Sequence, residues 1–218
     1  MAFLVKFLVA FCSICYELIL AQSLSAFLEN TVLRYSITIG LYMFAMGMGA
    51  LVVERRRGSA VCLLWKIEVA LTIIGALGIP SLFLAEHLLS SRWFFALWAH
   101  GLILLIGFLT GFELPLVLRM VGEKDPGLRH KILAFDYAGA FAGSLFFVFF
   151  IYPLIGLVPA GSVVALLNAV AGLLLVRSSW GRDLKGRGLW QIGLVVCLIA
   201  GVAASPLIEK ALLGLYLP

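Results

Sequence analysis

Residues 93–118 read WFFALWAHGLILLIGFLTGFELPLVL, an apolar run that contains one acidic residue, Glu113, and no Lys or Arg. An α-helix rises about 1.5 Å per residue, so about 20 apolar residues cross the roughly 30 Å hydrocarbon core of a bilayer. This run is therefore long enough to span a membrane as one helix. Pro115 lies near its end, where proline can bend or break a helix.

The same pattern recurs along the chain. We expect about seven spanning helices, over residues 3–28, 33–53, 60–84, 93–118, 132–155, 159–176 and 189–208. Strands are not expected, because a lipid-facing sheet must close into a barrel and these runs lack a period of two. The sequence predicts an all-α polytopic membrane protein, with one transmembrane domain over residues 1–208 and a short interfacial tail over 209–218.

Composition excludes an ordinary soluble enzyme. Of 218 residues, 63% are hydrophobic and 12% charged, and the mean hydropathy is +1.13. Soluble domains are about half apolar and about a quarter charged, and one of this size could not bury the excess. We expect the lipid bilayer as a partner and no nucleic acid. The chain has no phosphate-loop, dinucleotide or zinc-protease motif, so we expect no cofactor and no metal.

Positive charge predicts the orientation of the chain. The Lys and Arg residues gather in alternate loops: Arg55, Arg56 and Arg57; Arg119, Lys124, Arg129 and Lys131; Arg177, Arg182, Lys185 and Arg187. The positive-inside rule places these basic loops and the N-terminus in the cytoplasm, in what we expect to be a bacterial inner (plasma) membrane.

We single out five ionisable side chains within the apolar runs as intramembrane charges: Glu17, Lys66, Glu68, Glu113 and Asp136. Charges in hydrocarbon are costly, so they face the bundle interior, pair with one another or serve function. One base cannot pair with four acids. Two interpretations stay open: a cation or proton site in a cavity open to the cytoplasm, or an internal polar network that holds the helices in register.

Small residues recur at helical spacing in two runs. Gly40, Gly47 and Gly49 mark the second run, and Gly139 and Gly143 the fifth. Glycines spaced in this way let helix backbones approach closely in a membrane, so we expect these five to pack helices.

Four stretches carry a resemblance to a known family. They are residues 16–18 (YEL), 36–49 (SITIGLYMFAMGMG), 111–116 (GFELPL) and 136–144 (DYAGAFAGS). Together they resemble the membrane domain of the fused membrane spermidine synthases, over about residues 10–175. In that family a helical bundle precedes an aminopropyltransferase domain, and the bundle resembles a six-helix half of a major facilitator transporter. Tyr16 and Tyr137 adjoin two of the acids and are supporting candidates for the site.

The resemblance implies a role in polyamine chemistry without supplying a catalytic residue here. No stretch could form the family's α/β catalytic domain, so we expect a membrane-only relative or part of a longer protein. Three functions stay open: a membrane module of spermidine synthesis, a small cation, polyamine or proton-coupled transporter, and a structural subunit of a membrane complex. The expected partners are a polyamine, an aminopropyltransferase domain or subunit, and a second copy of the chain.

Overall fold

The computed structural model describes residues 2–56, 58–89, 91–121, 126–184 and 186–215. Arg57, Lys124 and Lys185 of the predicted basic loops lie outside these ranges. Within the described part, all regular secondary structure is helical, and seven spans are long and apolar enough to cross a membrane. The predicted all-α polytopic fold with about seven spanning helices is confirmed.

The spans match the predicted runs to within a few residues. Five of the elements are α1 (Ala2–Leu28), α2 (Thr31–Glu54), α3 (Ala60–Leu88), α8 (Leu157–Arg177) and α9 (Gly188–Gly214). The fourth span consists of α4 (Arg92–Thr110) and α5 (Glu113–Val121). The fifth consists of α6 (Pro126–Phe146), the π-helix η1 (Phe147–Ile151) and α7 (Tyr152–Ile155), and a 3₁₀-helix, η2 (Ser179–Leu184), joins α8 to α9.

The break between α4 and α5 follows from proline chemistry. Pro115 has no amide hydrogen to bond the carbonyl of Gly111, and its ring crowds that carbonyl. The helix therefore stops at Thr110 and restarts at Glu113, which places this acid in the first turn of α5. Pro80, in contrast, lies inside α3, which continues to Leu88.

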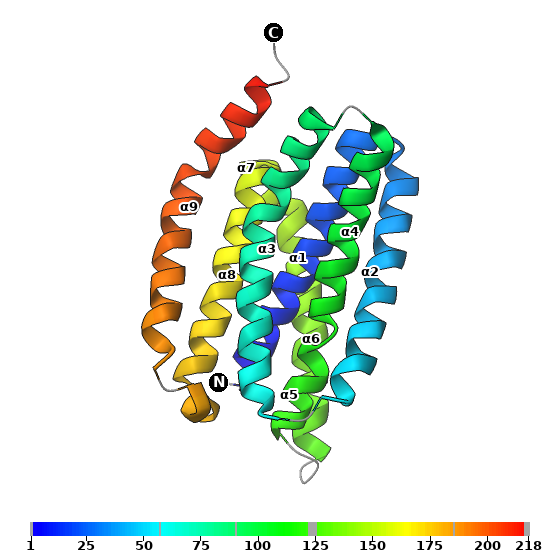
Figure 1. Cartoon of the computed structure of the whole chain (residues 1–218). Helices are drawn as coiled ribbons and strands as arrows, with labels where there is room; N and C mark the ends of the chain where they lie inside the picture. Colours follow the sequence, from blue (N-terminus) through cyan, green and yellow to red (C-terminus); the bar gives the residue numbers. More distant parts are fainter. Residues whose placement is uncertain (1, 57, 90, 122–125, 185, 216–218) are drawn as a thin grey trace.

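The helices form one bundle with α1 near its centre (Figure 1). In this bundle α1 packs against α2, α6 and α8, and α3 packs against α4 and α8. The N-terminus of α1, the C-termini of α2 and α5, and η2 lie at one end, which we call the basic end because Arg55, Arg56, Arg119, Arg129 and Arg187 belong to it. The predicted basic loops thus share one end, and which side of a membrane this end faces stays a prediction.

Glycines set two of the helix contacts. A Cβ at Gly49 of α2 would overlap the carbonyl oxygen of Phe108 in α4. On α6, a Cβ at Gly139 would overlap the carbonyl of Phe7 in α1, and one at Gly143 would lie 2.7 Å from the carbonyl of Phe11. The remaining two predicted glycines, Gly40 and Gly47, are exposed and have nothing within 4 Å of the Cβ position. They therefore pack no helix within this chain.

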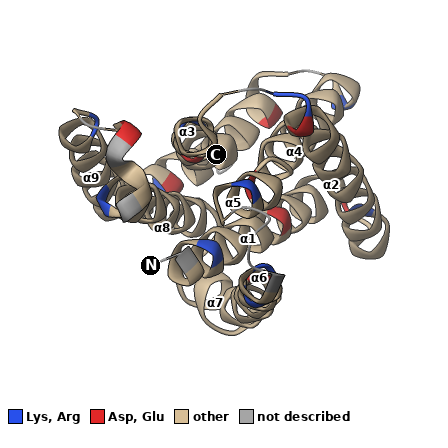
Figure 2. Ribbon diagram, turned by 90° about the horizontal axis from the view of Figure 1, so that it is seen from below, with Lys and Arg blue, Asp and Glu red and all other residues tan. Residues whose placement is uncertain are grey.

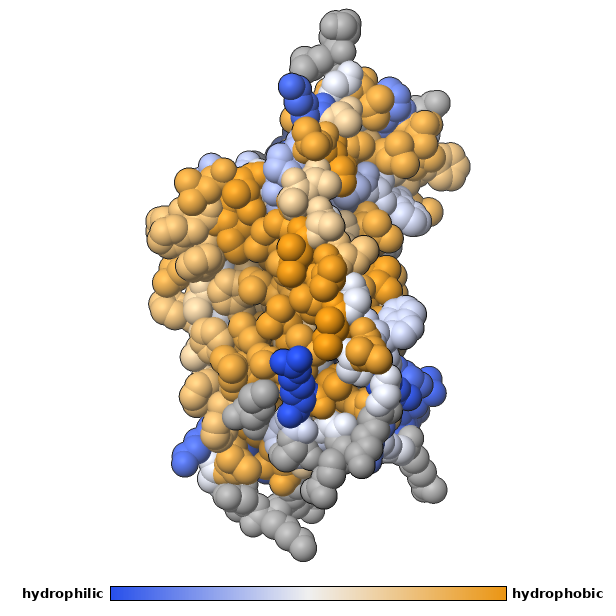
Figure 3. Space-filling view, turned by 90° about the vertical axis from the view of Figure 1, so that its left-hand side faces the viewer, coloured by the Kyte–Doolittle hydropathy of each residue, from blue (hydrophilic) through white to orange (hydrophobic). Residues whose placement is uncertain are grey.

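The last helix lies at the edge of the bundle. α9 packs mainly on α8, and its buried residues are Gln191, Leu198 and Ser205. Gln191 bonds two neighbours: its amide nitrogen donates to the carbonyl of Ala169 at 2.8 Å, and its amide oxygen accepts from Trp65 at 3.0 Å. The face that carries α9 is covered by apolar side chains along most of its length (Figure 3). α9 continues without a break past residue 208, and the predicted interfacial tail stays a prediction.

Candidate functional site

A buried ion pair joins α1 and α6, two helices in close glycine contact. Lys6 of α1 places its Nζ atom 2.7 Å from Oδ1 of Asp136 on α6, and the Lys6 side chain is 2% exposed. The neighbouring Gly139 contact brings the two backbones close enough for this pair. Figure 2, seen from the basic end, shows basic and acidic segments of α1, α5 and α6 side by side. Sequence reasoning missed Lys6, because a lysine this near the start of a helix resembles one that reaches the membrane surface.

A cavity of about 530 Å³ lies beside this pair, between α1, α2, α5 and α6. Ligand pockets commonly measure about 300–1,000 Å³. Three of the predicted acids line the cavity together with the unpredicted base: Glu17, Glu113, Asp136 and Lys6. The carboxylates therefore exceed the ammonium groups in its wall by two.

Glu113 is the most deeply placed of these acids. Its side chain is 2% exposed, and its Oε1 atom has no hydrogen-bond partner among the described residues. The restart of the helix at this residue directs the side chain to the cavity wall. A carboxylate in the first turn also suits the positive end of the helix dipole. Because buried polar groups are almost always paired in native proteins, a free carboxylate oxygen in a cavity wall indicates a place for a ligand donor.

Glu17 lines the same cavity about three helical turns from Lys6 on α1. The two are eleven positions apart, which corresponds to about 16 Å along the helix axis. Glu17 is 9% exposed, and within the described part of the chain it forms no ion pair. The cavity is thus elongated along the helices, with carboxylates at both ends.

Neutral hydroxyl groups form the wall between these ends. Tyr42 of α2 donates from its hydroxyl to the carbonyl of Ser13 at 3.1 Å. The hydroxyl of Thr110, at the end of α4, lies 3.0 Å from the same tyrosine oxygen. These three residues line the cavity and join α1, α2 and α4, so its shape is held by hydrogen bonds as well as by packing.

Other predicted site residues lie elsewhere. Glu68 of α3 is 1% exposed, and neither of its carboxylate oxygens has a hydrogen-bond partner among the described residues, but it does not line the cavity. Lys66 is exposed on the same helix and contributes nothing to the cavity wall. Tyr16 is buried against Gly75 of α3, whereas Tyr137 lines the cavity and is 73% exposed.

The spacing of the acids constrains what the cavity could hold. Among the described residues, no three His, Cys, Asp or Glu side chains converge closely enough to hold a metal ion. The carboxylates are instead distributed along the cavity, with apolar side chains such as Met43 and Leu114 between them. Such a wall suits an elongated cation whose charges are separated by methylene groups, because each charge is costly to bury without its own counter-charge.

Comparison with known proteins gives a consistent set of relatives. Polyamine aminopropyltransferases 2 and 1 of Ralstonia nicotianae are each 36% identical over 225 residues, which cover 97% of this chain and 44% and 42% of theirs. Polyamine aminopropyltransferase 2 of Streptomyces coelicolor is 32% identical over 209 residues, or 89% of this chain and 37% of its own. The chain thus spans less than half the length of these curated relatives. No protein-family profile and no solved structure matches it.

Proposed function

Since this chain is homologous, over 97% of its length, to part of the polyamine aminopropyltransferases, we propose that it is a membrane module of polyamine synthesis that binds an amine in its acidic cavity. In this proposal the aminopropyl transfer itself belongs to another domain or subunit. The chain anchors that enzyme to the membrane and holds its amine substrate or product. The basic end faces the cytoplasm of a bacterial inner membrane, in accord with the positive-inside rule.

The cavity wall is the observation that carries this proposal. Glu17, Glu113 and Asp136 offer three separated carboxylates against the single ammonium of Lys6. Polyamines are linear chains in which ammonium groups alternate with short methylene segments. Opposite charges attract strongly where water is excluded, and apolar side chains accept the methylene segments. The dispersed acids therefore suit polyamines, the compounds for which the related aminopropyltransferases are named.

Lys6 has a specific part in the proposal. Its ammonium group neutralises Asp136 from inside the protein, 2.7 Å from the carboxylate. A ligand ammonium has the same chemistry and competes for the same oxygen atoms. We therefore assign Asp136 as the acid whose partner alternates between Lys6 and the ligand. Glu17 and Glu113 are the acids that hold the ligand directly.

The direct test is binding of spermidine to the purified chain in detergent, measured by calorimetry. Glu17→Gln, Glu113→Gln and Asp136→Asn each remove one charge with little change in shape. Loss of one charged hydrogen bond is worth about 1.5–3 kcal/mol, so we expect each variant to bind roughly tenfold more weakly or worse. Glu86→Gln, on α3 outside the cavity, is the matched control and should bind as the parent does. A parent chain that binds no spermidine at millimolar concentration would refute the proposal.

A structural role is the second candidate, and the Lys6–Asp136 ion pair favours it. In that case the charges serve only to hold α1 against α6. Asp136→Asn would then lower the thermal stability of the chain while spermidine neither binds nor stabilises the parent. Amine binding, in contrast, must raise the melting temperature of the parent as its concentration increases.

A further inference from the structure

We propose that the acidic cavity continues into a second cavity at the basic end, and that together they form one groove with a single opening to the aqueous phase, on the basic-end side. A linear amine would then enter and leave by the same mouth. The identity of the ligand rests on the proposed function, whereas the path itself rests only on the geometry.

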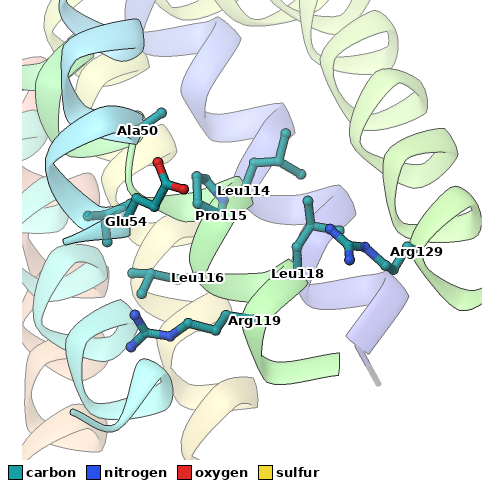
Figure 4. A pocket seen from close by; sticks show the side chains of 9 residues that line it. Ala50, Glu54, Leu114, Pro115, Leu116, Leu118, Arg119 and Arg129 are labelled. Carbon is teal, nitrogen blue, oxygen red and sulfur yellow. The ribbon is translucent and has the colours of Figure 1, made fainter. Parts of the chain in front are cut away.

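The two cavities have a common wall. The second cavity measures about 440 Å³ and is lined by residues of α2, α5 and α6 (Figure 4). Ala50, Leu114 and Pro115 line both cavities. Because the same three residues border both spaces, the cavities adjoin at this point.

The groove follows the axis of α2. Residues that line it recur along successive turns of this helix, from Tyr42 through Met46 and Ala50 to Glu54. Tyr42 and Glu54 are twelve positions apart, which corresponds to about 18 Å of helix. Because Glu54 ends α2 at the basic end, the groove runs from the middle of the bundle to that end.

Charged residues mark the mouth. Figure 4 shows the carboxylate of Glu54 directed toward Pro115, and the side chain of Arg129 beside Leu118. Arg119 is held aside, because its guanidinium donates to the carbonyls of Arg56 at 2.7 Å and Gly58 at 2.9 Å. A cation entering the groove therefore meets the carboxylate of Glu54 on the α2 side, before the three carboxylates of the inner cavity.

The inner end of the groove is crossed by a chain of hydrogen bonds. Past Glu17, Gln22 of α1 donates to the hydroxyl of Tyr152 on α7 at 2.8 Å and accepts from the hydroxyl of Tyr35 on α2 at 2.7 Å. The side of the inner cavity between α2 and α6 is bordered by Met43 and Tyr137, which are exposed on the apolar surface of the bundle. A polycation cannot arrive from hydrocarbon, where each charge costs several kcal/mol. The aqueous mouth at the basic end is the remaining route, which suits exchange with an enzyme on that side.

Accessibility of introduced thiols tests the route without requiring a ligand. Cys12 and Cys15 are completely buried and can stay, while Cys62 and Cys197 are replaced by serine. Ala50→Cys then places one thiol where the two cavities meet. The controls are His130→Cys, exposed at the basic end, and Val32→Cys, exposed at the opposite end. Each variant is treated with a membrane-impermeant maleimide in vesicles of both orientations.

We expect Ala50→Cys to react only from the side that labels His130→Cys. Spermidine should slow this reaction about tenfold at about ten times its Kd, when the site is about nine-tenths occupied. The proposal is overturned if Ala50→Cys reacts from the side that labels Val32→Cys. It is also overturned if Ala50→Cys reacts from neither side in vesicles but does react after the protein is denatured. Leu114→Cys, at a second position that lines both cavities, gives the same readout should Ala50→Cys not fold. If Ala50→Cys reacts from the basic side and spermidine does not slow the reaction, the groove is supported and amine binding is refuted.

Discussion

The two halves of the bundle, toward the basic end and away from it, use buried polar groups in opposite ways. Buried carboxylates gather in the basic half, where oxygen atoms of Glu113 and Glu68 have no hydrogen-bond partner among the described residues. In the opposite half, a polar contact that joins α1, α2 and α7 is neutral and paired. There Gln22 donates to the hydroxyl of Tyr152 at 2.8 Å and accepts from the hydroxyl of Tyr35 at 2.7 Å.

This difference separates what stabilises the protein from what equips it for a ligand. Neutral, mutually satisfied groups and packed rings lower the free energy of the folded state and leave nothing to bind. Buried carboxylates with free oxygens raise that free energy unless a partner arrives. The same helices, α1 to α4, pass through both halves. We call the basic half the receptive half, because its free carboxylate oxygens can bind a ligand, and the opposite half the packed half. Substitutions in each half should therefore change different measurements.

The largest effect is expected from Lys6→Met in the basic half. The substitution keeps the length of the side chain and removes the charge that balances Asp136. Removal of one partner of a buried ion pair costs about 3–5 kcal/mol, and the expected loss lies at the low end of that range because the remaining Asp136 side chain is 21% exposed. We expect thermal unfolding in detergent to shift down accordingly.

Two further variants sharpen this first prediction. Lys6→Met combined with Asp136→Asn should recover most of the lost stability, because the uncompensated carboxylate is gone. Lys66→Met changes an exposed lysine on α3 and should stay within about 0.5 kcal/mol of the parent. A single Lys6→Met variant as stable as the parent would show that the pair contributes little, and the contrast between the two halves would lose its main support.

In the opposite half, Phe27→Ala should separate stability from binding. The ring packs edge-to-face against Phe83 and Phe95, and truncation of a packed phenylalanine leaves a cavity that costs about 3 kcal/mol or somewhat more. Phe27 is partly exposed, so the expected loss lies at the low end of that range. Spermidine affinity of the folded variant should equal that of the parent. A tenfold change in affinity without a stability loss would place these rings in the site.

The glycine contacts predict a smaller loss that does not depend on charge. Gly49→Ala forces a methyl group into the carbonyl oxygen of Phe108, and both groups belong to helix backbones that cannot rotate away. Such overpacking typically costs about 1–3 kcal/mol. Gly40→Ala, on the same helix with open space around the Cβ position, is the matched control and should not lose stability. Equal melting temperatures for the two variants would contradict the close α2–α4 contact.

Helix positions were predictable from the sequence because the thickness of a bilayer fixes the length of each apolar run. The helix predicted over 33–53 is observed as Thr31–Glu54, where Asn30 accepts a hydrogen bond from the amide of Leu33 and so fixes the start. The helix predicted over 60–84 continues to Leu88. Its last turn contains Glu86 and His87, polar residues that the apolar pattern leaves out but a helix end tolerates.

The site was only partly predictable, because hydropathy shows that a helix is in the membrane but not which of its faces points inward. Glu17, Glu113 and Asp136 were identified as intramembrane acids, and the structure brings all three to one cavity. Lys6 could not be recognised without knowing that Asp136 faces it from α6. Gly40 and Gly47 resemble Gly49 in the sequence, yet α4 approaches only the face that carries Gly49. Such choices depend on long-range packing.

The smallest expected effect concerns the hydroxyl wall where the two halves meet. Thr110→Val removes the hydroxyl that lies 3.0 Å from the Tyr42 oxygen and keeps the shape of the side chain. Because Tyr42 still donates to the carbonyl of Ser13 at 3.1 Å, only one of its contacts is lost, at a cost of about 1 kcal/mol. Ser36→Ala is the control, since that exposed hydroxyl donates to the carbonyl of Val32 in its own helix. If Thr110→Val also weakens spermidine binding while Ser36→Ala does not, the hydroxyl wall belongs to the receptive half. If stability falls and affinity stays, Thr110 belongs with the packed half, and the boundary between the halves lies on the basic side of Tyr42.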